Sequence, residues 1–373
     1  MVKHETEIAV IGGGLVGMAV AFGLRRRGRD VTVFDEGDHA FRAARGNFGL
    51  IWVQGKGATL PDYARWTRYS AAKWPDFAQQ LGAETGIDLE LSQPGGFDIF
   101  LNDTEAEVAI GRLDRLRAAV GGDYPFEFVE PARLRDMIPE VGPAVVGAIH
   151  CPEDGHVNPL YLLRALTAAF LQAGGIFENG ASVMKIEPQL DAFTIHHTRP
   201  WRAGKIVLCA GLGNTELAPM LGLQAAIRPE RGQILVTERV RPFLKYPTIQ
   251  IRQTGEGALQ IGASQEDVGL DDGTSAPVIS EIANRACQIF PLLEQVRMVR
   301  CWAALRVMSA DGCPIYQRSQ THPGATLVNC HSGVTLAAAH ASALAAWIDG
   351  AAAPELLESF SAKRFDVLAS SAA

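Results

Sequence analysis

The hydrophobic pattern begins with a short buried strand over residues 5–11, and a helical spacing of apolar positions follows over 15–27. A second apolar run over 31–34 ends in Asp35, and it is predicted to be a buried strand. Gly28 stands just after the helix, where a glycine commonly ends one. A strand–helix–strand unit of this size is typical of a parallel crossover, so the chain is expected to open a doubly wound sheet.

The rest of the chain alternates between helical and strand-like spacings. Residues 42–60 are rich in glycine without a clear period, and we expect them to form a shaped loop. Helices are predicted at 61–85, 105–120, 160–173 and 278–289, and a long alanine-rich helix is predicted after Gly333. Strands are predicted at 97–101, 181–186, 205–209, 233–237, 258–262 and 325–329.

Composition excludes several classes of protein. With 373 residues, of which 47% are hydrophobic, the chain can bury a sizeable core and is neither disordered nor a disulfide-stapled miniprotein. A net charge of −7 gives no electrostatic footprint for nucleic acid. No apolar stretch reaches the ~20 residues of a membrane span, and no signal peptide is visible. The six cysteines form no CxxC pair, so we expect no metal site and a reducing, cytoplasmic setting.

Gly12, Gly14 and Gly17 form a G-x-G-x-x-G pattern between the first strand and the first helix. The first glycine allows a tight turn, the second lets a pyrophosphate approach the backbone, and the third lets helix and strand pack closely. Asp35, at the end of the second strand, can accept hydrogen bonds from a ribose diol and would repel a 2′-phosphate. The pattern therefore predicts a site for FAD or NAD and disfavours NADP.

A second glycine turn favours FAD. Gly333 to Leu336 begins a helix after a strand, and a helix N-terminus directed at a flavin stabilises the negative charge that develops on reduction. An NAD-dependent enzyme would not need this C-terminal nucleotide-binding piece. Since such features open the chain, recur in its middle and return at its end, we predict one nucleotide-binding domain from 1–85, 141–225 and 301–373. Residues 86–140 and 226–300 are then expected to form a substrate domain.

Six stretches carry a family resemblance that spans nearly the whole chain: 8–14, 154–159, 207–211, 231–233, 305–314 and 331–335. Their motifs and order resemble the D-amino acid oxidase-like FAD-dependent oxidoreductases, which include glycine oxidase and sarcosine oxidase. Within this family, residues 45–57 and 330–340 look most like the FAD-carrying B or beta subunits of heteromeric enzymes. These are opine oxidase, D-hydroxyproline and L-proline dehydrogenases, and hydrogen cyanide synthase.

The resemblance implies an α/β (α+β) fold, in which a doubly wound FAD-binding domain from three segments is covered by an antiparallel-sheet substrate domain. Around the ADP half and beneath the dinucleotide it places Gly12, Gly14, Gly17, Asp35, Val183, Ala210 and Gly211. Against the ribityl chain and the flavin it places Arg42, Asn47, Gly49, Gly333, Val334, Thr335 and Leu336. Some sarcosine oxidases tether FAD to a cysteine just before Asp311; none stands between Trp302 and Ala310 here, so FAD is expected to bind non-covalently.

The resemblance also places Arg306 where glycine oxidase-like relatives bind the substrate carboxylate. A guanidinium can bind a carboxylate through two charge-assisted hydrogen bonds, each worth ~1.5–3 kcal/mol. The alternative is a structural ion pair, for example with Asp311. The implied reaction is oxidation of the C–N bond of an opine, D-amino acid or imino acid, with hydride transfer from the substrate to flavin N5.

The electron acceptor is suggested by Gln260, which stands where sarcosine oxidases carry a lysine linked to oxygen reactivity. This favours a dehydrogenase that passes electrons to a second subunit carrying another flavin or an iron–sulfur cluster. The alternatives are a stand-alone oxidase of the glycine or sarcosine oxidase kind that uses O₂, and a non-catalytic FAD-binding assembly subunit. Lys56 could face the flavin or the substrate and His331 could touch the flavin, although exposed or structural roles are equally open. Trp302 could line the substrate pocket, although a buried core position is commoner for such a residue.

Overall fold

The first strand, β1 (Glu5–Ile11), is apolar from Ile8 onward because it lies in the middle of a parallel sheet that is covered on both faces. The computed structural model describes residues 4–37, 43–352 and 354–365. Helix α1 (Leu15–Arg26) and strand β2 (Val31–Asp35) follow, and β1 pairs with β2 in parallel. The predicted strand–helix–strand unit is therefore confirmed, with ends that differ from the prediction by no more than a residue.

The central sheet has the strand order β16-β17-β11-β1-β2-β8, with β10 and β9 added beside β11. Strands from β17 to β8 run parallel to one another. Strand β16 pairs antiparallel with β17, β10 pairs antiparallel with β11, and β9 pairs antiparallel with β10. Their bounds are β8 (Ile176–Asn179), β9 (Lys185–Pro188), β10 (Phe193–His196), β11 (Trp201–Leu208), β16 (Ile315–Arg318) and β17 (Ala325–Asn329).

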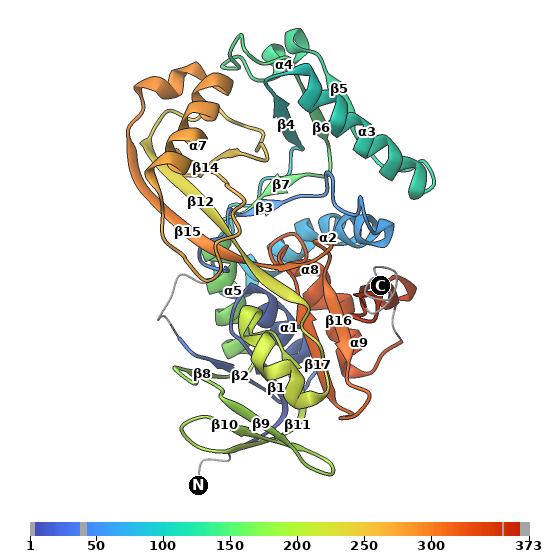
Figure 1. The fold of residues 1–373 in the computed structure, drawn as a ribbon. Coiled ribbons are helices and arrows are strands. Elements are labelled where there is room, and N and C mark those ends of the chain that lie inside the picture. Colours follow the sequence, from blue (N-terminus) through green and yellow to red (C-terminus); the bar gives the residue numbers. More distant parts are fainter. Residues whose placement is uncertain (1–3, 38–42, 353, 366–373) are drawn as a thin grey trace.

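Helices from distant parts of the chain pack together with α1 beside this sheet (Figure 1). They are α2 (Pro61–Thr85), α5 (Pro159–Gln172) and the C-terminal run of α8 (Ala337–Ala339), the π-helical turn η4 (His340–Leu344) and α9 (Ala345–Asp349). Shorter helices are η1 (Gly211–Gly213), α6 (Asn214–Leu217), η2 (Ala218–Leu221), η3 (Pro291–Gln295) and η5 (Glu355–Phe360). Within the described residues, no helix is both long and apolar enough to cross a membrane.

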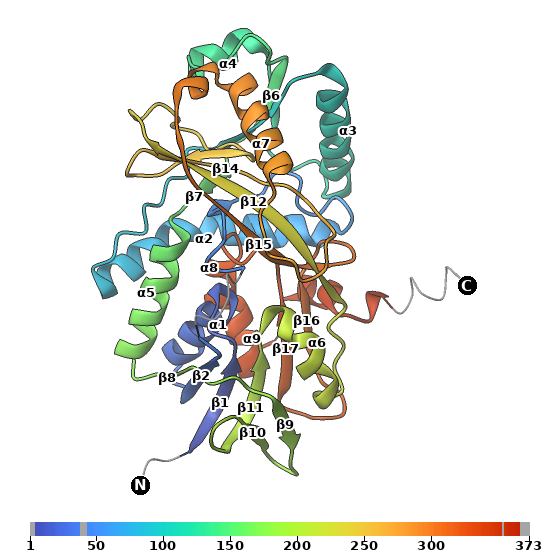
Figure 2. The same cartoon turned by 60° about the vertical axis from the view of Figure 1, so that its left-hand side comes forward.

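A four-stranded antiparallel sheet lies above the central sheet in the view of Figure 1, and its strand order is β13-β14-β12-β15. Helix α7 (Ala276–Ile289) covers one face, where Leu235, Leu259 and Ile261 share a core with Ile279. Side chains alternate along a strand, so the neighbours of these leucines and isoleucines face the opposite way. The strands are β12 (Ile227–Arg239), β13 (Ile251–Gln253), β14 (Ala258–Gly262) and β15 (Met298–Ser309), and Figure 2 shows the long β12 and β15 running from the upper to the lower part of the molecule.

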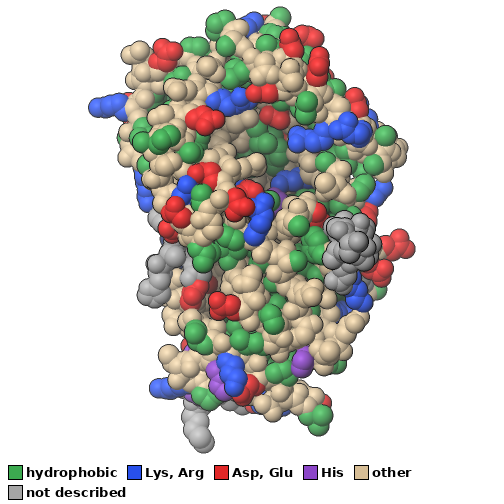
Figure 3. Space-filling model, viewed as in Figure 1, with side chains coloured by type: hydrophobic (Ala, Val, Ile, Leu, Met, Phe, Trp, Pro, Cys, Tyr) green, Lys and Arg blue, Asp and Glu red, His purple; other side chains and the backbone are tan. Residues whose placement is uncertain are grey.

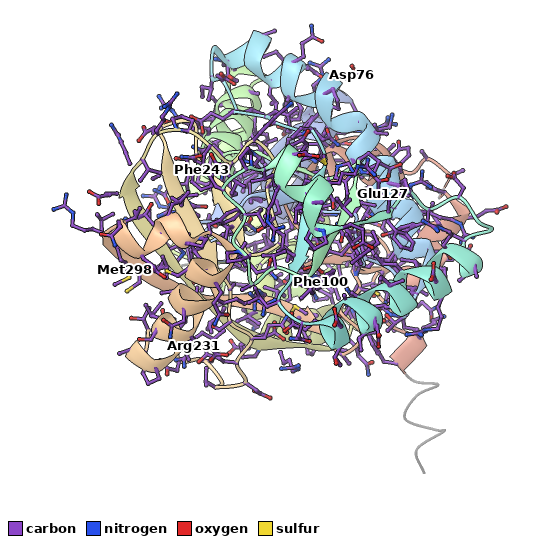
Figure 4. All side chains as sticks on the ribbon, turned by 90° about the horizontal axis from the view of Figure 1, so that it is seen from above. Asp76, Phe100, Glu127, Arg231, Phe243 and Met298 are labelled. Carbon is purple, nitrogen blue, oxygen red and sulfur yellow. The ribbon has the colours of Figure 1, made fainter. Side chains whose placement is uncertain are left out.

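A smaller antiparallel sheet, β4-β6-β5, completes the upper part. Seen from above, it lies beside the four-stranded sheet, with Phe100 and Glu127 on its strands and Arg231 and Met298 on the other sheet (Figure 4). The bounds are β4 (Gly96–Phe100), α3 (Asp103–Ala119), β5 (Glu127–Val129), α4 (Pro131–Met137) and β6 (Gly147–Cys151). Two short strands, β3 (Leu50–Ile51) and β7 (Gly155–His156), pair beneath it.

The combination of a parallel doubly wound sheet with antiparallel sheets confirms the predicted fold class. The division into five segments remains a prediction, and two strands do not follow it. Strand β6 falls in segment 141–225 but pairs with β4 and β5, and the boundary between 300 and 301 lies inside β15.

Two elements begin later than the sequence predicts. The strand predicted at 181–186 begins only at Lys185, where pairing with β10 begins. The helix predicted to start at Gly333 begins at Ala337, because residues 333–336 form turns first. The last residue of these turns still takes part in helical hydrogen bonding, because the Leu336 carbonyl accepts from the His340 N–H at 2.8 Å.

Candidate active site

The glycine turn after β1 is packed too tightly to admit most side chains. A Cβ at Gly12 would lie 2.5 Å from the Cys209 carbonyl oxygen, and a Cβ at Gly17 would lie 1.9 Å from the Gly12 oxygen. Gly14 caps α1 and differs, since its nearest neighbour would be the Ala44 Cβ at an ordinary 3.5 Å. The space beside Gly14, at the N-terminus of α1, therefore suits a pyrophosphate.

Asp35 is held at the same turn by two backbone N–H groups. Its Oδ2 accepts from the Gly13 N–H at 2.7 Å, and its Oδ1 accepts from the Gly37 N–H at 2.9 Å. Each carboxylate oxygen has a second lone pair, so the group can still accept from a ribose hydroxyl. The turn and this carboxylate fit the ADP half of a dinucleotide.

The loop before β3 and the turn before α8 meet in space although they are far apart in sequence. The Gly49 N–H donates to Asn47 Oδ1 at 2.7 Å, and Gly49 has φ +92°, which favours glycine. Thr335 Oγ1 accepts from the Trp52 N–H at 3.1 Å and donates to the Leu50 carbonyl at 3.2 Å. The structure thus joins two of the predicted flavin-contacting segments.

The turn over residues 333–336 also reaches the first glycine turn. A Cβ at Gly333 would lie 3.2 Å from the Val16 side chain, so Gly333 lies beside the start of α1. Val334, Thr335 and Leu336 are buried in the same region. Three segments from the beginning and the end of the chain therefore border one space.

The remaining predicted cofactor contacts lie at other positions around the sheet. Ala210 and Gly211 follow β11, and the Ala210 Cα would be 2.9 Å from a Cβ at Gly12. Val183 is half-buried before β9 and packs, like Ala210, against the apolar cluster around β11. Arg42 lies outside the described residues. The contacts of all these residues with FAD stay predictions.

Arg306 projects from β15 on the sheet face that is turned away from α7. Its Nη1 donates to Glu230 Oε1 and to the Ser264 carbonyl, both at 2.9 Å. The guanidinium lies over Gly232, where a Cβ would be 2.5 Å from Nη2. In the described part of the chain, Nη1 is the only guanidinium nitrogen of Arg306 that donates a hydrogen bond, and the side chain is 28% exposed. Arg306 can therefore bind a further anion.

The ion pair considered from the sequence, between Arg306 and Asp311, is not formed. Asp311 Oδ2 instead accepts from Arg364 Nε at 2.7 Å. The partner of Arg306 is Glu230, which stands directly opposite it in the pairing of β12 with β15. Sequence reasoning had no signal for this partner, because it depends on the register between two strands that are distant in the chain.

Lys56 and His331 form a polar pair whose contact the sequence did not reveal. Lys56 Nζ lies 3.0 Å from His331 Nε2, and that nitrogen lies 3.1 Å from Ser332 Oγ. Tyr63 Oη donates to the same Ser332 oxygen at 2.7 Å. Burial, together with the nearby Arg306 charge, lowers the pKa of Lys56 to about 8. Burial, Lys56 and Arg306 also hold the pKa of His331 well below its usual value.

A second arginine, Arg252 on β13, anchors the four-stranded sheet to the loop before β3. It is only 2% exposed, and its Nε donates to the Phe48 carbonyl and to Gln260 Oε1. Its Nη1 lies 3.3 Å from His156 Nδ1. Gln260, the residue that replaces the oxygen-linked lysine, is thus engaged by Arg252. In the same loop, the Gly46 carbonyl accepts from Trp302 Nε1 at 3.3 Å.

On the surface, a hollow opens between the upper and middle parts of the molecule (Figure 3). A basic side chain and a histidine are visible inside it. Across the described ranges, no group of three or more His, Cys, Asp and Glu residues is arranged to hold a metal ion.

Comparisons with known proteins agree with this architecture. The family described as FAD dependent oxidoreductase matches residues 7–347. The B subunit of opine oxidase from Agrobacterium tumefaciens is 41% identical over 364 residues, which cover 97% of this chain and 98% of that protein. The Rhizobium meliloti protein of the same name is 40% identical, with 97% and 98% covered. The structure of glycine oxidase from Geobacillus kaustophilus superposes with a TM-score of 0.89 at 24% identity, covering 96% of this chain and 98% of that one.

Proposed function

The chain belongs to the family of FAD dependent oxidoreductases, and from this premise we propose that it oxidises the C–N bond of an amine that carries a carboxylate. The substrate is an opine, a D-amino acid or an imino acid, and the chain is the catalytic subunit of a heteromeric dehydrogenase. When bound, FAD supplies the two-electron acceptor, by hydride transfer to its N5. The protein supplies binding, orientation and electrostatics.

The residues of the chain fit this cofactor. When FAD is bound, Gly14 at the N-terminus of α1 would hold the pyrophosphate, and the Asp35 carboxylate would hold the ribose. The loop at Asn47 and Gly49 and the turn from Gly333 to Leu336, which are joined through Thr335, would hold the flavin. Because these segments come from distant parts of the sequence, the cofactor site forms only when the whole domain folds.

The observation that carries the proposed reaction is the position of Arg306. Its guanidinium is held by Glu230 and Ser264, yet it keeps donors that no described residue uses. A carboxylate bound there is fixed by charge-assisted hydrogen bonds, which hold the adjacent carbon in one orientation. The amine must bind in its neutral form, and the positive charge of Arg306 favours loss of its proton.

The chain is proposed to pass its electrons to another subunit. Two relatives of about 40% identity carry the name of a B subunit, which supports a multi-subunit enzyme. We propose a partner that carries a second flavin or an iron–sulfur cluster. Mass spectrometry of the complex purified from its own host tests this assignment, and peroxide formed in equal amount to oxidised amine by the single chain would instead favour an O₂-using oxidase.

The reaction is tested by mixing the FAD-loaded protein with carboxylated amines in the absence of oxygen. Loss of the visible flavin absorbance shows catalysis, whereas no loss with any opine, amino acid or imino acid favours a structural role for FAD. Arg306→Ala is expected to raise KM more than tenfold while the ratio of FAD to protein stays unchanged. An unchanged KM would remove Arg306 from the substrate site.

A further inference from the structure

Arg252 is a buried cation for which the protein provides no ion-pair partner. It lies on β13 and is 2% exposed, yet no carboxylate in the described ranges comes within ion-pair distance of it. Burial lowers the pKa of Arg252 to about 10, so the group remains charged at neutral pH. Arg231, the other arginine that is buried in the described part of the chain, donates to both Glu266 and Asp271. Because an unpaired buried charge is costly, folding alone does not account for the charge of Arg252.

The groups that accept hydrogen bonds from Arg252 are all uncharged. Its Nε donates to the Phe48 carbonyl and to Gln260 Oε1, and Gln260 stands directly opposite in the pairing of β13 with β14. Its Nη1 donates to His156 Nδ1 at 3.3 Å. Burial, together with the Arg252 charge, lowers the pKa of His156 to about 4, so this ring is neutral. Nη2 donates to no acceptor within residues 4–37, 43–352 and 354–365, so it can bind a group from outside the chain.

The guanidinium lies against the loop that is predicted to contact the flavin. A Cβ at Gly49 would lie 3.2 Å from Arg252 Cζ, and the Phe48 carbonyl that accepts from Nε directly precedes Gly49. The Leu50 carbonyl comes next, and it accepts from Thr335 Oγ1 in the turn before α8. Arg252 therefore lies beside the point where two of the predicted flavin-contacting segments meet.

Reduction of the cofactor creates a negative charge at such a place. A hydride carries two electrons and one proton, so an uncharged flavin ring that accepts a hydride, and no further proton, gains one negative charge. The neutral amine that loses the hydride becomes a protonated imine. A fixed positive charge stabilises the anionic ring most strongly where burial excludes the water that would screen it.

We propose that Arg252 is the counter-charge for the reduced flavin and sets how readily the bound FAD accepts a hydride. This inference rests on the predicted place of the flavin beside Gly49, and it holds for whichever carboxylated amine supplies the hydride. A protein without this charge should retain oxidised FAD, and reduction of that FAD should be less favourable.

Sulfite tests the charge without any amine or electron acceptor. It adds to oxidised flavin, leaves a negative charge on the ring and bleaches the visible absorbance, so a titration of the holoenzyme gives Kd. Arg252→Gln keeps an N–H donor for the Phe48 carbonyl but loses the charge, and we expect this Kd to rise at least tenfold. The midpoint potential of the flavin should fall in parallel by at least ~30 mV, which corresponds to tenfold for two electrons. Arg252→Lys keeps the charge, and its sulfite Kd should stay within threefold of that of the unmodified protein.

Arg239→Gln is the matched control, because it removes a positive charge from the same sheet. The Arg239 side chain is 71% exposed and is paired with Glu256. Its replacement should leave the sulfite Kd and the potential unchanged. An unchanged sulfite Kd in Arg252→Gln, or an equally large rise in Arg252→Lys, would overturn the assignment of Arg252.

Gln260→Glu decides the matter if Arg252→Gln fails to fold or to retain FAD. It keeps the arginine and places a carboxylate where the Gln260 amide now accepts from Nε. The sulfite Kd should again rise at least tenfold, and an unchanged Kd would overturn the proposal. Failure of the proposed function appears separately, as a flavin that binds sulfite as expected but that no amine reduces without oxygen.

Discussion

Gly232→Ala should displace Arg306, the arginine proposed to bind the substrate, without touching the substrate. Gly232 lies opposite Ala304 in the pairing of β12 with β15, and the Arg306 guanidinium rests directly over it. A Cβ would lie 2.5 Å from Nη2, 2.8 Å from Cζ and 3.1 Å from Nη1 of Arg306. Because these atoms are the flexible end of a side chain, the guanidinium will move while the strand stays in place.

The size of the effect follows from the size of the clash. Ordinary contact begins at 3.4 Å, so the guanidinium must move by about 1 Å. A misplacement of this size can cost up to ~100-fold in a positioned reaction. Loss of one charge-assisted hydrogen bond, worth ~1.5–3 kcal/mol, gives roughly the same range. We therefore expect kcat/KM to fall between about tenfold and a hundredfold.

The assay is flavin reduction without oxygen, followed at several substrate concentrations. FAD content and the melting temperature should match the unmodified protein. Gly111→Ala is the matched control, because its Cβ would lie an ordinary 3.5 Å from Arg115 Nη1 on α3. It should leave the kinetics unchanged. The reasoning fails if Gly232→Ala binds and oxidises substrate as the unmodified protein does.

Two further predictions concern the glycine turn after β1 and the partly buried Lys56. Gly17→Ala places a Cβ 1.9 Å from the Gly12 oxygen, so we expect ~1–3 kcal/mol of lost stability and loss of FAD, seen by thermal unfolding and by the visible absorbance; retention of FAD with an unchanged melting temperature would contradict it. The pKa of Lys56 is about 8 when folded, below its usual 10.5, so between these pH values the unfolded chain binds the extra proton and stability rises with pH. Chemical denaturation at several pH values should show that the free energy of unfolding rises with pH in the unmodified protein and rises less in Lys56→Met. Equal slopes of this free energy against pH in the two proteins would refute the prediction. The groups whose charges affect the pKa of Lys56 are Cys330, Arg306, Cys313 and Asp154. His331 is its hydrogen-bond partner.

The parts of the fold that were predictable are those whose signals are local. The unit from β1 to β2 shows its period within a few residues, and Gly12 and Gly17 mark a turn that excludes side chains. The strand predicted at 181–186 began late because its start depends on pairing with β10 and not on its own period. Strand β6 likewise lies in the upper part because it pairs with β4 and β5, and no local sequence pattern predicts that pairing.

The candidate site was only partly predictable for the same reason. Arg306 stands in a recognisable motif, but its partner Glu230 follows from the register of two strands. Lys56 and His331 are each visible in glycine-rich stretches, yet their contact joins loops at opposite ends of the chain. Arg252 gave no signal, since a single arginine in a strand is usually exposed and its burial results from the loop at Phe48.

The long pair of strands β12 and β15 ties the two halves of the molecule together. Their hydrogen-bonded ladder begins at Ile227, which packs against the lower apolar cluster, and continues past Leu235, which lies in the upper one. This two-stranded ribbon restricts motion of the two halves relative to each other, because such a motion would bend the strands or break main-chain hydrogen bonds between them. Molecules should therefore come and go through the existing opening with only local loop adjustment, and small-angle X-ray scattering curves with and without a bound carboxylate should superimpose.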